Sequence, residues 1–328
     1  MNRVTPPQST LMAEAFVRPV GGNGRGGFLA ELDGRMRGGW PRLAPHLREA
    51  VLTWLPLFAA SGGGFRGRLG DADTYYTDFG VRLLDIADAP HEAFERAGQY
   101  LGARPSAHDV VDLFSRLNIG RLLGPRNITL PVPENARDIL SAQVAGDGGF
   151  AHPGGTETSG YVTFLAALIF EITGEPFPSP QRTAAALRRL KRPDGGFADR
   201  AGDASSQAST TAASVATLGK LGAIEASETA DAVRFLVSLQ TDSGGLGAFR
   251  GAPEPDLLST FTAVTTLAHL GALDLLRLAP LARFVLDRKM AIGFTGSPSD
   301  PDADVEYTFY GVGCLCLLQQ HLAPAATA

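Results

Sequence analysis

The chain has 328 residues, 44% of them hydrophobic, and a formal net charge of −5 at pH 7. This length and composition suffice for a large core, and we expect one domain because no linker-like stretch interrupts the chain after Gly62. Basic residues are scattered rather than gathered in a stripe, which argues against a nucleic-acid partner. No apolar run is as long as a membrane span and no signal-peptide segment opens the chain, so a soluble, cytoplasmic protein is expected.

The first 42 residues differ in composition from the rest of the chain. They are rich in glycine, proline and arginine and include the run Gly21-Gly22-Asn23-Gly24-Arg25-Gly26-Gly27. This composition predicts an irregular arm over residues 1–42. One repeated domain over residues 43–322 and a short tail over residues 323–328 are expected to follow.

A Gly-Gly-aromatic turn recurs through this domain. Its copies, some of them degenerate, are Gly63-Gly64-Phe65, Gly148-Gly149-Phe150, Gly195-Gly196-Phe197, Gly244-Gly245-Leu246 and Ile292-Gly293-Phe294. From Gly149 to Gly196, Gly245 and Gly293 the steps are 47, 49 and 48 residues, and the step of 85 residues from Gly64 to Gly149 leaves room for one degenerate unit. A period in this range is typical of a solenoid or a closed toroid.

A second signal follows each turn by about ten residues, where a small polar or acidic residue stands four positions before a threonine. The pairs are Asp73 and Thr77, Ser159 and Thr163, Ser206 and Thr210, Asp256 and Thr260, and Asp304 and Thr308. An Asp or Ser side chain can accept hydrogen bonds from the free N–H groups of a first helical turn. Each pair therefore predicts an N-cap and the start of a helix.

The predicted helices are of two kinds. Those before the turns, such as residues 180–191 and 228–240, are amphipathic, whereas those after the caps are apolar on almost every side. The apolar helices cover residues 160–172, 210–221, 259–270 and 307–318. Because such helices must be buried, we predict an all-α fold, an α-α toroid of six inner and six outer helices built from repeated helical hairpins. The N-termini of the inner helices are expected to gather at one rim.

These turns, helix starts and alternating helices resemble the α-α toroid of the protein prenyltransferase β subunits and the terpenoid cyclases. The resemblance covers roughly residues 45–321. It implies an isoprenoid or other apolar small molecule as the ligand, held in the funnel of the barrel, and leaves room for a helical protein partner.

Zinc-dependent members of this family hold the metal with an Asp and a Cys two residues apart, and with a His at the last inner helix start. The corresponding residues here are Asp256, Leu258 and Tyr307. Leucine cannot ligate a metal, and phenol is a poor zinc ligand beside thiolate or imidazole. Nor do the histidines show ligand spacing, so neither a metal nor another cofactor is expected; they are His46, His91, His108, His152, His269 and His321.

The family's diphosphate-binding residues are only partly matched. The resemblance carries an Arg onto Arg250 and a Tyr onto Tyr310, whereas Pro253 and Ser206 stand where the family has Lys and His. One cation remains of a cluster, which weakens the case for tight diphosphate binding. Arg250 is equally well explained as a solvated loop residue.

The class II terpene cyclases resemble the chain in another way, because they protonate an alkene with an Asp-x-Asp-Asp motif. Asp302-Ala303-Asp304 and Asp71-Ala72-Asp73 match its first three letters. Crowded carboxylates in a dry pocket can retain a proton by mutual repulsion. The candidate catalytic acids are Asp73, Asp302, Asp304 and Glu306. Closure of the ring is expected to bring Asp73 and Asp78 near Asp304 and Glu306 at one mouth. Alternatively, these acids only cap their helices.

Aromatic residues on the inner helices offer an apolar lining that can stabilise a carbocation, although ordinary core packing also explains them. The candidate substrate-binding residues are Arg250, Asp256, Tyr307, Tyr310, Tyr161 and Tyr76.

We therefore predict an isoprenoid-handling enzyme that performs acid-assisted cyclisation or metal-free prenyl transfer. The alternatives are a non-catalytic toroid that binds a lipid or a peptide, and a structural subunit of a hetero-oligomer. If the protein is an enzyme, we expect acids with raised pKa at a pocket, and if it is a binding module, we expect an apolar pocket without such acids. A structural subunit predicts a filled barrel and an exposed apolar patch.

Overall fold

The computed structural model describes residues 27–319 and residue 321. The expected tail over residues 323–328 and the first 26 residues of the expected arm lie outside this range. Within the described residues, no helix combines the length and the apolar character that crossing a bilayer requires.

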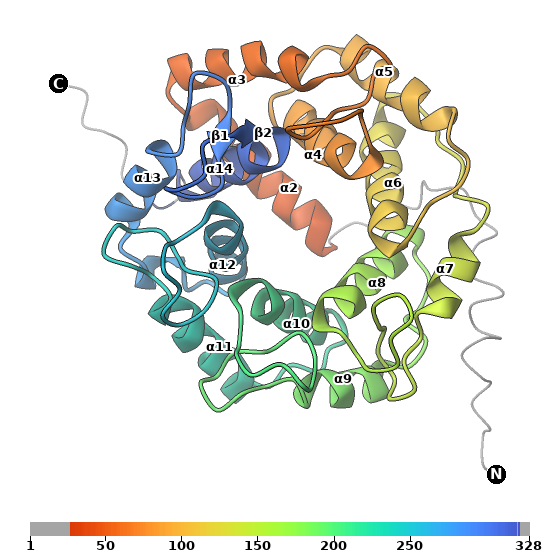
Figure 1. The fold of residues 1–328 in the computed structure, drawn as a ribbon, viewed down its shortest axis with the longest axis vertical. Coiled ribbons are helices and arrows are strands. Elements are labelled where there is room, and N and C mark those ends of the chain that lie inside the picture. The colour runs from red at the N-terminus through yellow and green to blue at the C-terminus, as the bar shows by residue number, and fades with distance from the viewer. Residues whose placement is uncertain (1–26, 320, 322–328) are drawn as a thin grey trace.

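Twelve of the helices form two concentric rings (Figure 1). The inner helices are α4 (Thr74–Ile86), α6 (Val110–Leu123), α8 (Gly160–Thr173), α10 (Ala208–Lys220), α12 (Leu257–His269) and α14 (Val305–Leu318). The outer helices are α3 (Pro45–Phe58), α5 (His91–Gly102), α7 (Ala136–Ala142), α9 (Pro180–Arg188), α11 (Ala226–Ser238) and α13 (Leu278–Leu286). Each inner helix packs on the next and α14 packs on α4, so the ring closes. The predicted α-α toroid of six inner and six outer helices is confirmed.

The remaining elements are short. Three 3₁₀ turns, η1 (Trp40–Arg42), η2 (Gly124–Arg126) and η3 (Leu273–Leu275), follow α2, α6 and α12. The strands β1 (Phe294–Thr295) and β2 (Ala303–Asp304) pair antiparallel, with Phe294 opposite Asp304.

One hydrogen bond joins each Gly-Gly-aromatic turn to the helix that follows it. In the unit of α8, the backbone N–H of Phe150 donates to the hydroxyl oxygen of Thr163 at 3.0 Å. The same bond links Phe65 to Thr77, Phe197 to Thr211, Leu246 to Thr260 and Phe294 to Thr308. The threonine thus satisfies a buried donor that the turn leaves unpaired, which explains why it recurs.

One predicted helix start was wrong by one residue. The N-cap position of helix α10 is Gln207 rather than Ser206, with no capping hydrogen bond from its side chain, and Thr211 rather than Thr210 accepts from the turn. The hydroxyl of Ser206 donates instead to Asp194 at 2.8 Å, and that of Thr210 donates to the carbonyl of Phe197 at 2.6 Å. Two adjacent threonines fit the sequence spacing equally well, and only the backbone geometry decides between them.

The predicted irregular arm is wrong over residues 28–42. Helix α2 (Phe28–Gly39) and η1 occupy this stretch, and in the view down the axis α2 is seen within the outline of the ring (Figure 1). Leu29, Leu32 and Met36 fall on one face of α2 and are buried. The three glycines within α2 lower its helix propensity, which is why the composition of this stretch predicted an irregular arm. Packing of the buried face against the inner helices stabilises the helix instead.

Helix α2 covers the C-terminal ends of the inner helices. Glu171 at the end of α8 accepts from the backbone N–H groups of Phe28 and Leu29 at 3.2 and 3.0 Å. Asp33 pairs with Arg121 of α6 at 2.5 Å, and Arg35 donates to the carbonyl of Ala268 of α12 at 2.8 Å. One end of the barrel is therefore closed by a helix from before the repeats.

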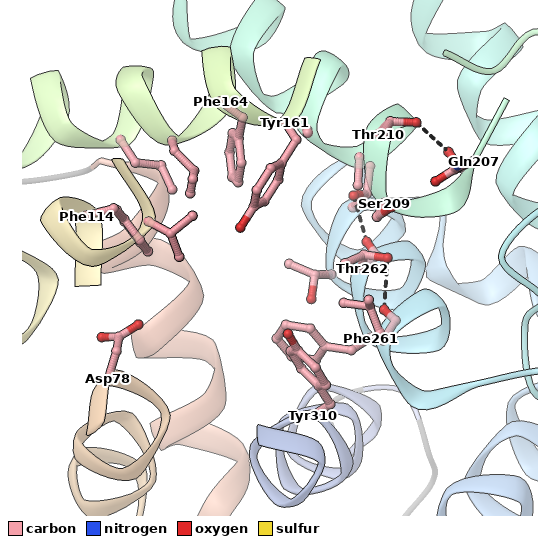
Figure 2. Close-up of a pocket in the computed structure, with 18 of the residues that line it drawn as sticks. Asp78, Phe114, Tyr161, Phe164, Gln207, Ser209, Thr210, Phe261, Thr262 and Tyr310 are labelled. Atoms are coloured by element: carbon pink, nitrogen blue, oxygen red, sulfur yellow. Dashed lines mark hydrogen bonds between the residues drawn. The ribbon is translucent and has the colours of Figure 1, made fainter. Parts of the chain in front are cut away.

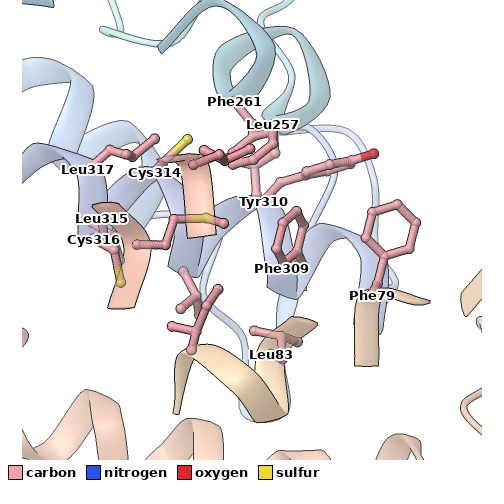
Figure 3. Close-up of a cluster of buried hydrophobic side chains, with 14 of the residues drawn as sticks. Phe79, Leu83, Leu257, Phe261, Phe309, Tyr310, Cys314, Leu315, Cys316 and Leu317 are labelled. Atoms are coloured by element: carbon pink, nitrogen blue, oxygen red, sulfur yellow. The ribbon is translucent and has the colours of Figure 1, made fainter. Parts of the chain in front are cut away.

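Aromatic side chains are packed where the ring closes, between α4, α12 and α14 (Figure 3). The ring centroid of Phe309 lies 5.5 Å from that of Phe79 and 5.2 Å from that of Phe261. Tyr310 lies 5.4 Å from Phe79 and contributes to the same cluster. Such burial and edge-to-face geometry stabilise the joint between the first and last units.

Candidate functional site

A cavity of about 580 Å³ lies along the axis of the ring. Phe28, Leu29 and Leu32 of α2 form its floor, and exposed loop residues at the N-terminal ends of the inner helices surround its mouth. Aromatic residues from several inner helices form much of its wall, and Figure 2 shows Phe114, Phe164 and Tyr161 extending into it. A concave, mostly apolar cavity with a few polar groups is typical of a small-molecule site.

The inner helices carry equivalent residues five positions after their N-caps, and all of these residues except Phe309 line the cavity. Five residues after the cap of each helix, four of the six units carry phenylalanine and one carries alanine: Phe114, Phe164, Phe261, Phe309 and Ala212. The sixth unit carries Asp78. Its carboxyl group extends into the same space as the aromatic rings (Figure 2).

Asp78 is the most deeply buried acid in the wall of the cavity, with 2% of its surface exposed. Burial raises its pKa from 3.8 to about 6, against the opposing effects of Arg82 and Asn118. Arg82 Nη1 lies 3.9 Å from the Oδ2 atom of Asp78, and its guanidinium lies 4.5 Å from the ring centroid of Phe309. A carboxyl group in this state carries a proton at mildly acid pH and has a cation beside it when the proton leaves.

The neighbours of Asp78 determine which of its oxygens can carry the proton. Asn118 Nδ2 donates to Asp78 Oδ1 at 2.7 Å, and Arg121 donates to Asn118 Oδ1 at 3.0 and 2.8 Å. Because Arg121 can only donate, the amide group of Asn118 is fixed with its N–H group toward Asp78. The proton of the neutral acid therefore resides on Oδ2.

Glu306 lies in the first turn of α14, also on the wall of the cavity. Its Oε1 atom accepts from the hydroxyl groups of Tyr75 at 2.7 Å and Tyr310 at 3.0 Å. Burial raises the pKa of Glu306, and these two hydrogen bonds oppose the rise. The contact with Tyr75 joins α14 to α4, so the first and last units of the ring both contribute to this part of the site.

Three of the predicted site acids cap helices and do not line the cavity. Asp73, Asp256 and Asp304 accept from the backbone N–H groups of Tyr76, Ser259 and Tyr307 at 2.7, 2.7 and 2.8 Å. Their predicted role as N-caps is confirmed. Burial raises the pKa of each of these carboxyl groups.

Arg68 ties the last helix start to the first unit. Its Nε atom donates to Asp304 at 2.9 Å, and its two terminal nitrogens donate to Asp300 at 2.8 and 2.5 Å. Asp302, the remaining predicted acid, is exposed on the adjoining loop.

The other predicted residues divide between the cavity and its surroundings. Tyr161 and Tyr310 line the cavity, whereas Tyr76 and Tyr307 lie outside it, Tyr307 with its ring 5.4 Å from the Arg68 guanidinium. Arg250 is exposed and lies 5.8 Å from the ring of Phe235.

The mouth of the cavity carries charge of both signs. Asp199, Asp203 and Glu306 contribute carboxylates, and His152 and Arg200 contribute nitrogen groups. Arg200 Nη2 already lies 3.4 Å from Asp203. This mixed rim does not form the cationic cluster that a diphosphate group requires.

The residues at the family's zinc position do not fit a metal. Both carboxylate oxygens of Asp256 accept from Ser259, at 2.7 and 2.8 Å, and Leu258 presents an apolar side chain to the cavity. Over residues 27–319, no three His, Cys, Asp or Glu side chains form a group that could hold a metal ion.

From the sequence, Asp78 was expected only as an acid near the mouth and Arg82 was not named, although a signal for both was present. Both interrupt an inner helix that must be covered on all sides, where an ionised group is costly unless it is paired. The aspartate caps form a more regular pattern in the sequence because they recur.

The comparisons with known proteins agree with this fold. The family model of the prenyltransferase alpha-alpha toroid domain matches residues 110–327. The chain belongs to this family. Among curated proteins, none matches the sequence significantly.

Three solved structures illustrate the likeness. The type II terpene cyclase MstE from Scytonema, in complex with geranylgeranyl dihydroxybenzoate, is 14% identical with a TM-score of 0.60, over 89% of this chain and 100% of that one. Candida albicans protein geranylgeranyltransferase-I, complexed with GGPP, is 12% identical with a TM-score of 0.57, over 74% and 82%. A protein from Actinoplanes is 16% identical with a TM-score of 0.53, over 83% and 97%. At these identities the likeness shows the fold alone.

Proposed function

We propose that this protein is an isoprenoid-handling enzyme in which Asp78 starts a cyclisation by donating a proton to a prenyl chain in the cavity. The observation that carries the proposal is a buried carboxyl group, with a pKa raised to about 6, on the wall of an otherwise largely aromatic cavity. An open cavity argues against a purely structural subunit, for which a filled barrel was expected. A protonatable acid inside the cavity favours an enzyme over a passive lipid-binding module.

The proposed first step uses groups that surround Asp78. The proton on Oδ2 passes to one carbon of a terminal alkene, and the electron pair of the double bond forms the new C–H bond. The carboxylate left behind accepts from Asn118 at 2.7 Å and faces the Arg82 guanidinium at 3.9 Å. The carbocation on the substrate is stabilised by neighbouring aromatic faces, among them Phe79 and Phe261.

The other predicted residues take different places in this proposal. Glu306, Tyr161 and Tyr310 line the cavity and would contact the substrate. We assign Asp73 and Asp304 to positioning the first and last inner helices rather than to proton donation, and we give Asp302 no direct role. Tyr76, Tyr307, Asp256 and Arg250 lie outside the cavity lining and would act on the substrate only indirectly.

The chemistry of the mouth narrows the substrate class. Carboxylates at the rim would repel a doubly charged diphosphate, whereas a neutral or weakly acidic head group avoids this repulsion. A prenyl chain without a diphosphate is therefore favoured. Geranylgeranyl dihydroxybenzoate, which MstE binds, is a suitable first probe, with geranylgeraniol as a simpler one.

The test is turnover of these two probes in D₂O, followed by mass spectrometry. Cyclisation started by an exchangeable acid adds one deuterium to the carbon skeleton, and Asp78→Asn should lower the rate by at least about a hundredfold. Asp138→Asn on the exposed face of α7 is the matched control and should leave the rate unchanged. Probe binding without turnover would identify a binding module, and equal rates for wild type and Asp78→Asn would remove the proton-donor role.

A further inference from the structure

Two polar side chains at the mouth of the cavity come from equivalent positions in consecutive units. His152 stands two residues after Phe150, and Asp199 stands two residues after Phe197. His152 Nε2 lies 2.8 Å from Asp199 Oδ2, and both residues line the cavity. They form a histidine–carboxylate pair across the seam between two repeats.

The other repeats provide an internal control for this pair. Their equivalent residues are Gly67, Ala248 and Gly296, which have no polar side chain. The same backbone hydrogen bond nevertheless joins neighbouring repeats with and without the pair. Where the pair is present, Gly160 N–H donates to the Asp199 carbonyl at 2.9 Å. Where it is absent, Ala208 N–H donates to the Ala248 carbonyl and Leu257 N–H to the Gly296 carbonyl, both at 2.8 Å. The joint between repeats therefore does not require His152 or the carboxylate of Asp199.

The hydrogen bonds of Asp199 determine the tautomer of His152. Asp199 Oδ1 accepts from the hydroxyl of Ser159 at 2.7 Å and from the backbone N–H of Tyr161 at 3.0 Å. These bonds hold the carboxylate in place, and its Oδ2 atom can only accept from the imidazole. Nε2 of a neutral His152 must then carry the hydrogen, which leaves a lone pair on Nδ1.

We propose that His152, oriented by Asp199, is the general base that ends the cyclisation. This inference rests on the proposed function. The C–H bond next to the final carbocation breaks, its electron pair forms a C=C bond, and the proton goes to His152 Nδ1. The substrate is thereby isomerised, and no oxidant or other co-reactant is needed.

The position of the pair fits a step late in the reaction. Helix α2 closes the far end of the cavity, so an apolar tail enters first and a polar head group stays near the mouth. Asp78 lies one helical turn deeper in the cavity than Tyr75, so it protonates the tail of the substrate. Cyclisation of the substrate then starts at the tail, and the positive charge moves along the prenyl chain toward the mouth. Glu306 is the competing base, but its Oε1 atom already accepts from two phenol groups.

The first experiment needs no substrate. Nitrogen-15 NMR of the imidazole groups, assigned by comparison with His152→Gln, should show a hydrogen on Nε2 and none on Nδ1 of neutral His152. Asp199→Asn should abolish this preference. A hydrogen on Nδ1 in the wild-type protein would overturn the inference, whatever the protein catalyses.

The second experiment measures products from geranylgeranyl dihydroxybenzoate. In His152→Ala, the ratio of alkene to water-captured alcohol should fall by about a hundredfold, the lower limit for a positioned base. Added imidazole should restore alkene to His152→Ala. Asp199→Asn should shift the ratio in the same direction.

His91→Ala is the matched control, because His91 also lies near a carboxylate, 3.5 Å from Glu95, but on the outer helix α5. An unchanged product ratio in His152→Ala, or a shift found only in Glu306→Gln, would overturn the inference. Loss of consumption in Asp78→Asn is tested separately, so failure of the proton donor and failure of the base give different results.

Discussion

Asp78→Asn should change the pH dependence of folding as well as the activity. The side chain of Asp78 is buried, and its pKa rises from the ordinary aspartate value of 3.8 to about 6 in the folded chain. A difference of about two pKa units, at about 1.36 kcal/mol each, corresponds to about 3 kcal/mol. An acid with a raised folded-state pKa contributes stability at low pH and loses it as the pH rises through that pKa.

The wild-type protein should therefore lose about 2–3 kcal/mol of unfolding free energy from this group between about pH 4 and pH 7. Asparagine imitates the protonated acid and does not titrate, so the variant lacks this loss. Urea denaturation gives the unfolding free energy of both proteins at the two pH values. Subtracting the change with pH in the variant from the change in the wild type leaves the contribution of Asp78, because the other titrating groups cancel. The same stability difference at both pH values would show that Asp78 does not titrate in this range and would refute the reasoning.

Three further outcomes are expected. The kcat/KM for cyclisation should fall about tenfold per pH unit above pH 6, because only protonated Asp78 donates, and a pH–rate profile measures this fall. Thr163→Val should destabilise the fold by about 1–3 kcal/mol in urea denaturation, since it leaves the buried N–H of Phe150 unpaired, whereas Thr163→Ser should restore most of the loss. Leu32→Ala should cost about 2–5 kcal/mol and enlarge the cavity at its floor, so that calorimetry shows improved binding of a prenyl alcohol one isoprene unit longer than geranylgeraniol.

The fold was predictable because local and global signals agree in each repeat. Turn glycines, helix caps and apolar helices all recur at one period, and each has a local physical reason. The position of α2 was not predictable in this way. Its burial depends on the ends of helices far along the chain, such as Glu171 and Arg121, and no local pattern around residues 28–39 contains that information.

The candidate site was only partly predictable. Glu306, Tyr161 and Tyr310 were named from the sequence and do line the cavity, because position near the start of an inner helix is fixed by the repeat. Asp78 was expected only as one of several acids near the mouth, and the His152–Asp199 pair was not part of the predicted site. The closed ring determines which side chains of an inner helix face the cavity and which loop residues meet between two repeats. Residues nearby in the sequence do not determine either.

The repeat itself explains why the recurring acids are poor candidates for catalysis. A residue present in nearly every unit serves what every unit needs, as Asp73, Asp256 and Asp304 do by capping inner helices around the whole ring. One asymmetric substrate needs a proton at one place, and an evenly spaced set of acids cannot provide that selectivity.

Residues that depart from the repeat can provide this selectivity for one position on the substrate. Asp78 replaces the phenylalanine or alanine of its equivalents, and His152 and Asp199 replace glycine or alanine. In each case a polar side chain stands where the fold is built without one elsewhere in the ring, so the fold itself does not account for its presence. In this ring we therefore expect the chemistry at the units that depart from the repeat.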